Sequence, residues 1–328
     1  MSRNLTFRPY RRRFRTALRT ARGTWREREG FLLRVEEGGR VGYGEVAPIP
    51  EFGSETLGQA RACLEALASD PLRGVPVDRP CCAFALSCAT APARAPRRDY
   101  ELAALLPAGE AAGEVLAAKA RAGYDVFKWK IGLSAPETEL ACFEGLLARA
   151  PEGARFRLDA NGGLSEGEAR RWMEGLRRWP GAVEFIEQPL APGQETRMAE
   201  LASETGVAVA LDESLNGPGG ADWLVPGAWT GPLVIKAPLM GDREALLRRL
   251  RPVAPQLVFS SVFETAVGLA NSLALADELA TVSRAVGFDT IAAFDDSLNP
   301  LPPGPGLGAA QRGEIDFDLL WTRLRPST

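Results

Sequence analysis

The sequence predicts an α/β protein, a (β/α)8-type (TIM-like) barrel with an N-terminal α+β capping domain. Over about 200 residues, short apolar strands alternate with amphipathic helices roughly eight times, a pattern typical of a parallel barrel. The preceding part of the chain shows a strand meander followed by two helices. The length of 328 residues also exceeds what one compact core usually holds, so we expect two domains.

Residues 1–95 are expected to form the capping domain. Residues 3–46 predict an antiparallel meander, in which a glycine turn at 37–40 separates strands at 31–36 and 41–45. Residues 55–70 have the spacing of an amphipathic helix, and residues 80–90 predict a buried one. The N-terminus is rich in arginine, but no apolar segment follows it as in a targeting signal. We therefore interpret these arginines as a solvated face of the sheet.

Residues 96–295 are expected to form the barrel, and residues 296–328 a C-terminal segment whose apolar stretch at 317–324 packs back on the capping domain. The competing structure is a doubly wound open sheet, whose dinucleotide-binding form needs a GxGxxG motif that is absent after the first strand. A capping box is expected at Ser165 and Glu168. The expected barrel strands are 100–106, 126–131, 155–159, 183–187, 207–212, 233–236, 257–260 and 291–294, and the expected helices are 110–122, 137–150, 165–179, 195–205, 243–251 and 265–279.

The composition excludes several kinds of chemistry and partner. The chain contains no histidine, which rules out Ser-His-Asp and Cys-His nucleophiles, histidine zinc sites and a histidine general base. Its five cysteines include no CxxC pair, so we expect buried reduced thiols. A net charge of −3 gives no indication of a nucleic-acid partner, and no apolar stretch is long enough to predict a membrane-spanning helix. We expect a cytoplasmic protein.

Charged and polar residues end successive predicted strands, one βα unit apart. In a barrel, groups at the C-terminal ends of the strands converge on one cavity. A single polar residue there is usually the N-cap of the next helix, but five successive strands repeat the pattern. The residues are Lys128 and Lys130 on the second strand, Asp159 and Asn161 on the third, Glu187 on the fourth, Asp212 and Glu213 on the fifth, Lys236 on the sixth, and Ser260, Ser261 and Glu264 at the seventh.

Three of these residues, Asp159, Glu187 and Asp212, predict a metal site. Carboxylates from adjacent strands would repel one another, and oxygen ligands select a hard cation, Mg²⁺ or alternatively Mn²⁺. Lys128 and Lys130 point to the same face of their strand. A neighbouring lysine, a dication and partial burial all favour the neutral amine that a lysine base needs. The pattern predicts removal of a proton next to a carboxylate of a small molecule, with the metal neutralising the charge that develops.

At these positions the sequence resembles the enolase superfamily, in particular its muconate-lactonizing-like subgroup. Within that subgroup it is most similar to the o-succinylbenzoate synthases of menaquinone and phylloquinone biosynthesis, and the resemblance covers nearly the whole chain. The matching stretches are Phe127-Lys-Trp-Lys-Ile-Gly132, Arg157-Leu-Asp-Ala-Asn-Gly162, Phe185-Ile-Glu-Gln-Pro-Leu190, Ala210-Leu-Asp-Glu-Ser214, Val234-Ile-Lys236 and Ser260-Ser-Val-Phe-Glu-Thr265, with Gly42-Tyr-Gly-Glu-Val-Ala-Pro48 and Phe52-Gly53 in the capping domain.

The resemblance implies a Mg²⁺-dependent syn dehydration of 2-succinyl-6-hydroxy-2,4-cyclohexadiene-1-carboxylate. It makes Lys130 the base, which then protonates the leaving hydroxyl. It also implies that Lys236 stabilises the enediolate from the opposite face and that Lys128 tunes Lys130. The remaining implied roles are metal binding by Asp159, Glu187 and Asp212, support of these ligands by Asn161 and Glu213, and contact with the succinyl tail by Ser260 and Ser261, with Glu264 beside them.

Two departures from the family pattern bear on specificity more than on chemistry. The proline that usually follows the sixth-strand lysine is displaced by one residue, in Lys236-Ala-Pro238, and the end of the barrel, Gly287-Phe-Asp-Thr290, is a looser match. By their position, residues 21–25 and 51–53 are the loops expected to cover the substrate.

Three alternatives remain open. Lys130 and Lys236 could both exchange a proton, as in an N-acylamino acid racemase, a dipeptide epimerase or a cycloisomerase. A lysine could instead form a Schiff base, although three converging carboxylates would then be unexplained. A non-catalytic binding protein would be expected to have lost a metal ligand or a lysine, and none is lost. In the racemase reading, an ammonium group of the substrate would be recognised by Asp289, Asp295 and Asp296.

Overall fold

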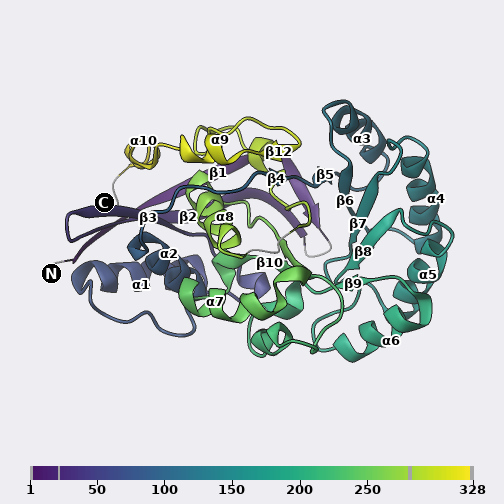
Figure 1. Ribbon diagram of the computed structural model, residues 1–328, viewed down its shortest axis with the longest axis horizontal. Helices are drawn as coiled ribbons and strands as arrows, with labels where there is room; N and C mark the ends of the chain where they lie inside the picture. Colours follow the sequence, from purple (N-terminus) through teal and green to yellow (C-terminus); the bar gives the residue numbers. More distant parts are fainter. Residues whose placement is uncertain (1–2, 21–22, 280–282, 326–328) are drawn as a thin grey trace.

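The structure is a computed structural model that describes residues 3–20, 23–279 and 283–325, apart from the side chains of residues 19 and 20. A three-stranded antiparallel sheet opens the chain, and two helices pack on it (Figure 1), so the predicted meander and both predicted helices are confirmed. The elements are β1 (Arg3–Thr20), β2 (Gly23–Glu37), β3 (Arg40–Val46), α1 (Leu57–Ser69) and α2 (Pro80–Thr90).

A closed parallel barrel follows, so the open-sheet alternative is excluded. Five strands pair in chain order, two more form a second parallel pair, and isolated parallel bridges (Leu211 to Leu233, Ser260 to Gly287 and Leu102 to Val286) join them into a ring. The strands are β5 (Ala104–Leu106), β6 (Val126–Lys130), β7 (Arg155–Asp159), β8 (Val183–Glu187), β9 (Val209–Ala210), β10 (Leu233–Ile235) and β11 (Leu257–Phe259).

Helices surround this ring, as Figure 1 shows on its right-hand side. The predicted capping box at the start of α5 is confirmed, because Ser165 Oγ accepts from the backbone N–H of Glu168 while the Glu168 carboxylate accepts from the N–H of Ser165. The helices are α3 (Ala112–Arg121), α4 (Pro136–Leu147), α5 (Glu166–Leu176), α6 (Glu195–Thr205), α7 (Arg243–Leu250) and α8 (Ala266–Asp277), and the short 3-10 helices are η1 (Pro50–Phe52), η2 (Glu213–Leu215), η3 (Gly220–Leu224), η4 (Ala237–Leu239), η5 (Arg251–Gln256) and η6 (Ile291–Ala293).

The eighth barrel strand, predicted at 291–294, is misplaced. Those residues form η6, and Phe294 makes a bridge to Phe14 of β1 instead. The barrel closes through Val286 and Gly287, whose N–H groups donate to backbone oxygens on either side at 2.8 Å each. Two bridging residues carry no readable periodicity. The apolar residues 291–294 imitate a strand because Ile291 packs into the apolar cluster of the barrel and Phe294 packs on Phe14 of the capping domain.

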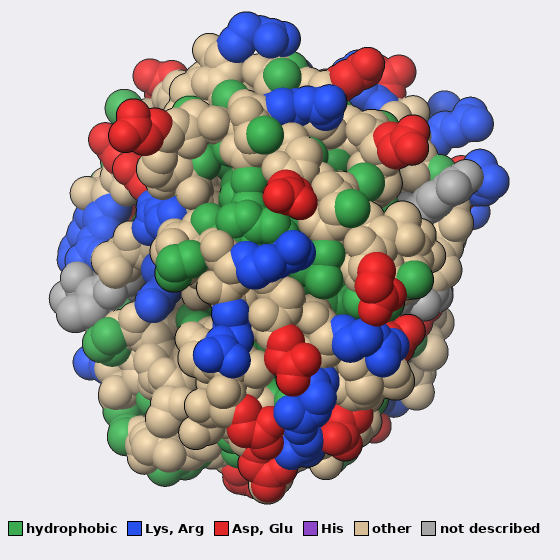
Figure 2. Space-filling view, turned by 90° about the vertical axis from the view of Figure 1, so that its right-hand side faces the viewer, with side chains coloured by type: hydrophobic (Ala, Val, Ile, Leu, Met, Phe, Trp, Pro, Cys, Tyr) green, Lys and Arg blue, Asp and Glu red, His purple; other side chains and the backbone are tan. Residues whose placement is uncertain are grey.

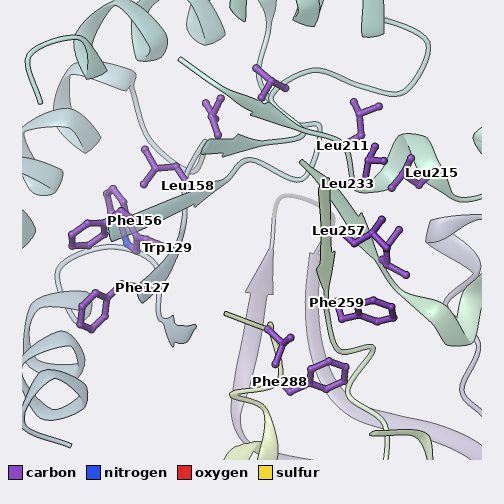
Figure 3. Close-up of a cluster of buried hydrophobic side chains, with 14 of the residues drawn as sticks. Phe127, Trp129, Phe156, Leu158, Leu211, Leu215, Leu233, Leu257, Phe259 and Phe288 are labelled. Atoms are coloured by element: carbon purple, nitrogen blue, oxygen red, sulfur yellow. The ribbon is translucent and has the colours of Figure 1, made fainter. Parts of the chain in front are cut away.

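The alternation of side chains along each strand positions the functional groups. Phe127 and Trp129 of β6 point outward into the large apolar cluster under the helices (Figure 3). Lys128 and Lys130 alternate with them and therefore face the inside of the barrel. The same alternation places a small apolar layer in the interior, below the C-terminal mouth, formed by Phe185, Ala210, Val234 and Val258.

The C-terminal segment lies against the antiparallel sheet. The guanidinium group of Arg8 donates to the carbonyl oxygens of Trp321 and Leu324 at 2.8 and 2.9 Å, and the rings of Tyr43 and Trp321 are 6.2 Å apart. The predicted strand 100–106 is split, because its first part, β4 (Tyr100–Glu101), pairs with β12 (Gly306–Leu307) of this segment, while its last part, β5, pairs with β6 of the barrel. The segment also contains α9 (Ala309–Gly313) and α10 (Phe317–Thr322).

The surface and the thiols fit the composition, with two corrections. On the face shown in Figure 2, Lys and Arg side chains are interspersed with Asp and Glu. The five cysteines are free thiols as expected, but only Cys81 and Cys82 are buried, whereas the other three, Cys63, Cys88 and Cys142, are half-buried. Within the described ranges, no helix has both the length and the apolar character needed to cross a membrane. The expectation that the N-terminal arginines form a solvated face is wrong for Arg12, whose side chain is buried between the sheet and the barrel.

Candidate active site

The strand register brings the predicted residues to one level of the barrel. Lys130 of β6 lies opposite Asp159 of β7, which in turn lies opposite Glu187 of β8. Asp212 lies two residues beyond β9, and Lys236 directly follows β10, on positions that alternate with outward apolar side chains. These charged groups therefore meet at the C-terminal mouth of the barrel.

A pocket of about 80 Å³ at this mouth is covered by the capping domain. Leu18, Trp25 and Phe52 line it together with the lysines. Residues 21 and 22 of the first predicted covering loop lie outside the described residues. A larger cavity, of about 650 Å³, lies between β3, residues 91–97 and α8, and its walls include none of the predicted site residues. The convergent polar groups therefore mark the smaller pocket as the site.

Lys128 and Lys130 face the first two carboxylates. Lys128 Nζ lies 2.6 Å from Glu187 Oε1 and 3.0 Å from Asp159 Oδ2. Lys130 Nζ lies 3.1 Å from the same Asp159 oxygen and donates to Asn161 Oδ1 at 2.6 Å. Asp159 is thus shared between two ammonium groups, and Asn161 fixes the position of Lys130.

Lys236 reaches the pocket from the other wall. β6 and β10 occupy the second and sixth of the eight barrel positions, so Lys130 and Lys236 approach the pocket from opposite sides. Lys236 is paired with Asp212, and its Nζ lies 4.4 Å from the ring centroid of Phe52. A cation over an aromatic face is held by the ring quadrupole, so the capping domain takes part in placing Lys236.

Burial and the neighbouring charges set the pKa values of the carboxylates. Burial, helped by the charge of Asp159, raises the pKa of Glu187 to about 7. Burial also raises the pKa of Asp212. It acts in the same direction on Asp159, but Lys128 and Lys130 outweigh it and hold the pKa of Asp159 below its usual range. Burial lowers the pKa of Lys128, but Asp159 and Glu187 outweigh this effect and raise it overall. These buried carboxylates therefore depend on nearby positive charge to remain ionised.

The carboxylate oxygens of the site are the kind of ligand that a hard cation prefers, although lysine ammonium groups lie between them. In the described part of the chain, no three acidic or thiol groups converge closely enough to coordinate a metal, because the lysine ammonium groups lie between the carboxylates. However, Asp212 Oδ1 and Glu213 Oε2 are buried oxygens without a hydrogen-bond donor. Such oxygens are typical ligands of Mg²⁺, which would take over the role of the ammonium groups.

Two residues behind the carboxylates have unusual backbones. Asn161, two residues beyond β7, and Gln188, directly after β8, both have positive φ, at 47° and 40°. Asn161 Nδ2 donates to Glu213 Oε1 at 3.2 Å, and Gln188 Oε1 accepts from the N–H of Asp212 at 3.0 Å. Strain of this kind is typical of functional sites. Gln188 was not among the predicted site residues, although the motif Glu187-Gln-Pro189 contains it.

The loop of residues 260–265 carries the remaining predicted residues. Ser260 and Ser261 line the pocket, whereas Glu264 lies behind them. The Glu264 carboxylate accepts from Ser261 Oγ at 3.0 Å and from the N–H of Val262 at 2.6 Å. Burial raises the pKa of Glu264 to about 7, although backbone donors partly offset it. Glu264 therefore holds the loop together rather than facing the pocket.

The acidic residues considered for an ammonium group already have cationic partners. Asp289 accepts from Lys119 Nζ and from Tyr124 Oη, each at 2.7 Å. Asp296 is paired with the buried Arg12, and Asp295 with Arg15. Of the three, only Asp289 lines the pocket. This arrangement disfavours recognition of an ammonium group there.

Comparison with known proteins gives the family. Residues 110–230 match the family described as Enolase C-terminal domain-like, and residues 11–93 match the family described as MenC, N-terminal domain. An o-succinylbenzoate synthase of Thermosynechococcus vestitus is 41% identical over 261 residues, which cover 76% of this chain and 81% of that protein. The chain belongs to the o-succinylbenzoate synthase family of the enolase superfamily.

Solved structures with a similar fold include both o-succinylbenzoate synthases and racemases. The o-succinylbenzoate synthase of Thermosynechococcus elongatus BP-1, complexed with Mg in the active site, matches with a TM-score of 0.80 and 35% identity, covering 98% of this chain and all of that one. An N-succinyl Arg/Lys racemase of Bacillus cereus matches with a TM-score of 0.79 at 16% identity, covering 99% and 98%, which shows the fold alone. The o-succinylbenzoate synthase family therefore shares its barrel with racemases, and the side chains in the pocket must decide the reaction.

Proposed function

We propose that this protein is an o-succinylbenzoate synthase, a hydro-lyase that converts 2-succinyl-6-hydroxy-2,4-cyclohexadiene-1-carboxylate into 2-succinylbenzoate and water. The observation that carries the proposal is the opposed pair Lys130 and Lys236, in a pocket that also holds Asp159, within a chain of this family. The paired state of Asp289 supports dehydration over the racemisation of an amino acid with a free ammonium group.

Lys130 is the proposed base. Its neutral amine takes the proton next to the substrate carboxylate, and the electrons of the broken C–H bond move onto that carboxylate as an enediolate. These electrons form the new ring double bond when the C–O bond breaks. The ammonium group so formed returns the proton to the departing hydroxyl, which leaves as water when the C–O bond breaks. One group can serve both steps because the two bonds lie on the same face of the substrate. The hydrogen bond to Asn161 at 2.6 Å supports this assignment, because it holds the amine at the pocket wall.

Lys236 and Lys128 have the proposed supporting roles. Lys236, on the opposite wall, stabilises the negative charge of the enediolate electrostatically. Lys128 adds positive charge beside Lys130 and so favours the neutral form of the base. When bound, Mg²⁺ would supply positive charge opposite the substrate carboxylate, and Mn²⁺ is the alternative. The proposed ligands are Asp159, Glu187 and Asp212, supported by Asn161 and Glu213, and the proposed neighbours of the succinyl tail are Ser260 and Ser261, with Glu264 behind them.

The decisive experiment is an assay with the cyclohexadiene precursor, with and without EDTA. We expect turnover that EDTA abolishes. Exchange of the α-proton of N-succinyl amino acids without turnover of the precursor would instead establish a racemase.

Matched lysine variants test the unequal roles. Arginine cannot lose its proton, so Lys130→Arg should be as inactive as Lys130→Ala. Lys236→Arg keeps the charge and should retain measurable dehydration, whereas Lys236→Ala should not. Equal loss in both arginine variants, in proteins that stay folded, would contradict a purely electrostatic role for Lys236.

We also propose the domain organisation stated above, namely a capping domain over residues 1–95, a barrel over 96–295 and a C-terminal segment over 296–328. The contacts of Trp321 with Arg8 and Tyr43 support the placement of the last segment. A cytoplasmic location without a nucleic-acid partner remains a prediction from the composition.

A further inference from the structure

Three buried charged side chains of the antiparallel sheet contact the barrel loop of residues 260–265. They are Arg12, Arg28 and Glu45, exposed to only 2%, 6% and 1%. By the strand register, all three side chains project from the same face of the sheet. Charged residues are almost never this buried unless they are fully paired, so their partners explain why they are there.

Arg28 connects the loop to the segment that precedes the pocket residue Phe52. Its Nε donates to the carbonyl oxygen of Val262 at 2.9 Å, and its Nη1 donates to that of Pro48 at 2.7 Å. One guanidinium group thus fixes two segments, and each leads directly into residues that line the pocket.

Arg12 holds the next part of the loop. Its Nη1 donates to the carbonyl oxygen of Glu264 at 2.6 Å, while Nε and Nη2 pair with Asp296 at 2.8 and 3.2 Å. Between these anchors lies Phe263, whose φ of 61° is uncommon for a bulky residue. Such a conformation is strained and persists only where its surroundings enforce it.

Glu45 holds the end of the loop, where α8 begins. Its carboxylate accepts from the N–H of Thr265 at 2.9 Å and from the N–H of Gly268 at 2.9 Å. These are the N-cap and the third residue of the helix, so Glu45 supplies from another part of the chain the carboxylate of a capping box. Tyr10 donates to the same carboxylate at 2.7 Å and fixes it in place.

The sheet itself gains little from these charges. Arg12 and Arg28 are direct cross-strand partners, an arrangement of like charges that destabilises a sheet. Both guanidinium groups are nevertheless buried, and both donate to consecutive parts of one loop. Holding this loop is therefore the feature that accounts for the pair.

We propose that Arg12, Arg28 and Glu45 form a positioning clamp that sets the substrate-binding geometry of the 260–265 loop from the capping domain. The inference rests on the proposed function, since the loop carries Ser260 and Ser261 into that pocket. None of the three clamp residues contacts Lys130 or the proposed metal ligands Asp159, Glu187 and Asp212. Loss of the clamp should displace Ser260 and Ser261 and so weaken substrate binding, while the proton transfer is little affected. We therefore expect KM to rise with little change in kcat.

The test compares Arg28→Met, Arg12→Met and Glu45→Gln with the control Arg312→Met, each as the full chain with Mg²⁺. Arg312 is equally buried, at 3%, and pairs with Asp277 at the far end of α8, so its loss destabilises the protein without touching the loop. We expect KM for the cyclohexadiene to rise about tenfold or more in the clamp variants, with kcat within about threefold. We also expect faster amide hydrogen exchange in residues 262–268. Glu45→Gln keeps the shape of the side chain and serves if an arginine variant does not fold.

Two results would overturn the clamp: an unchanged KM in the folded clamp variants, or an equal rise of KM in Arg312→Met. A fall in kcat alone would also overturn it, because it would report a smaller folded fraction rather than a displaced loop. If the wild-type protein does not turn over the precursor, the proposed function fails separately. The exchange comparison with Arg312→Met then decides whether the clamp orders the loop.

Discussion

Gly268→Ala is expected to destabilise the protein, although alanine is the better helix former. In an exposed helix this change would stabilise by up to about 1 kcal/mol. At Gly268, however, a Cβ would lie 2.8 Å from Glu45 Oε2 and 2.8 Å from Glu264 Cβ, both inside contact distance. Overpacking of this kind costs about 1–3 kcal/mol, and the hydrogen bond of Gly268 N–H to the Glu45 carboxylate would lengthen at a similar cost. We expect the free energy of unfolding to fall by about 2 kcal/mol in urea titrations.

Gly58→Ala is the matched control. Gly58 also lies in the first turn of a helix, α1, but a Cβ there would meet no heavy atom within 4 Å. The control should be as stable as the wild-type protein or more stable, by up to about 1 kcal/mol. If Gly268→Ala matched or exceeded the stability of the wild type, Glu45 would not be packed against the start of α8 and the capping argument would fail.

Three further predictions concern charge. The raised pKa of Glu264, about 7 against an ordinary 4.5, means that between these values the folded state keeps a proton that the unfolded state has released. Stability should therefore fall as pH rises through this window, with at most about 3 kcal/mol from Glu264. Because the pKa of Glu187 is also raised to about 7, Glu264→Gln should reduce this slope in denaturant titrations at different pH without abolishing it. Saturating Mg²⁺, at about 100 times its Kd, should stabilise by about 2.7 kcal/mol in thermal unfolding, and an equal response of Asp212→Asn would contradict its role as a ligand. Asn161→Asp places a carboxylate beside Lys130, which favours its ammonium form and should shift the rising limb of the pH–rate profile upward by about one unit.

Much of the fold was predictable because local patterns and the global fold agree. Strands β6, β7 and β8 end at Lys130, Asp159 and Glu187, which lie at the mouth of the barrel, and the apolar residues before them have the period of a strand. A single strand such as β6, with Phe127 and Trp129 outward and Lys128 and Lys130 inward, contains both the packing signal and the functional signal. The convergence of the charged groups follows from that alternation once the barrel is assumed.

The errors arose where partners distant in sequence determine the structure. Val286 and Gly287 close the barrel with one bridge each, which leaves no pattern in the sequence, while Phe294 is apolar because it packs on Phe14. In the sequence, Arg12 looks like any other surface arginine. It is buried through its contacts with Glu264 and Asp296, which lie 252 and 284 residues later in the chain. Local propensity carries no information about such contacts.

The choice between lysine and arginine carries functional information of its own. The chain has 39 basic residues, of which only four are lysines, and three of these, Lys128, Lys130 and Lys236, lie in the pocket. Arginine fills the buried and exposed ion pairs almost everywhere else, so positive charge alone does not account for Lys130, the proposed base. Lysine, unlike arginine, can lose its proton when burial or neighbouring charges lower its pKa. For Lys130 this difference is sufficient reason for a lysine, because an arginine there could not accept a proton. Lys128 and Lys130 also share the carboxylate of Asp159, so the charge state of one lysine affects the other directly.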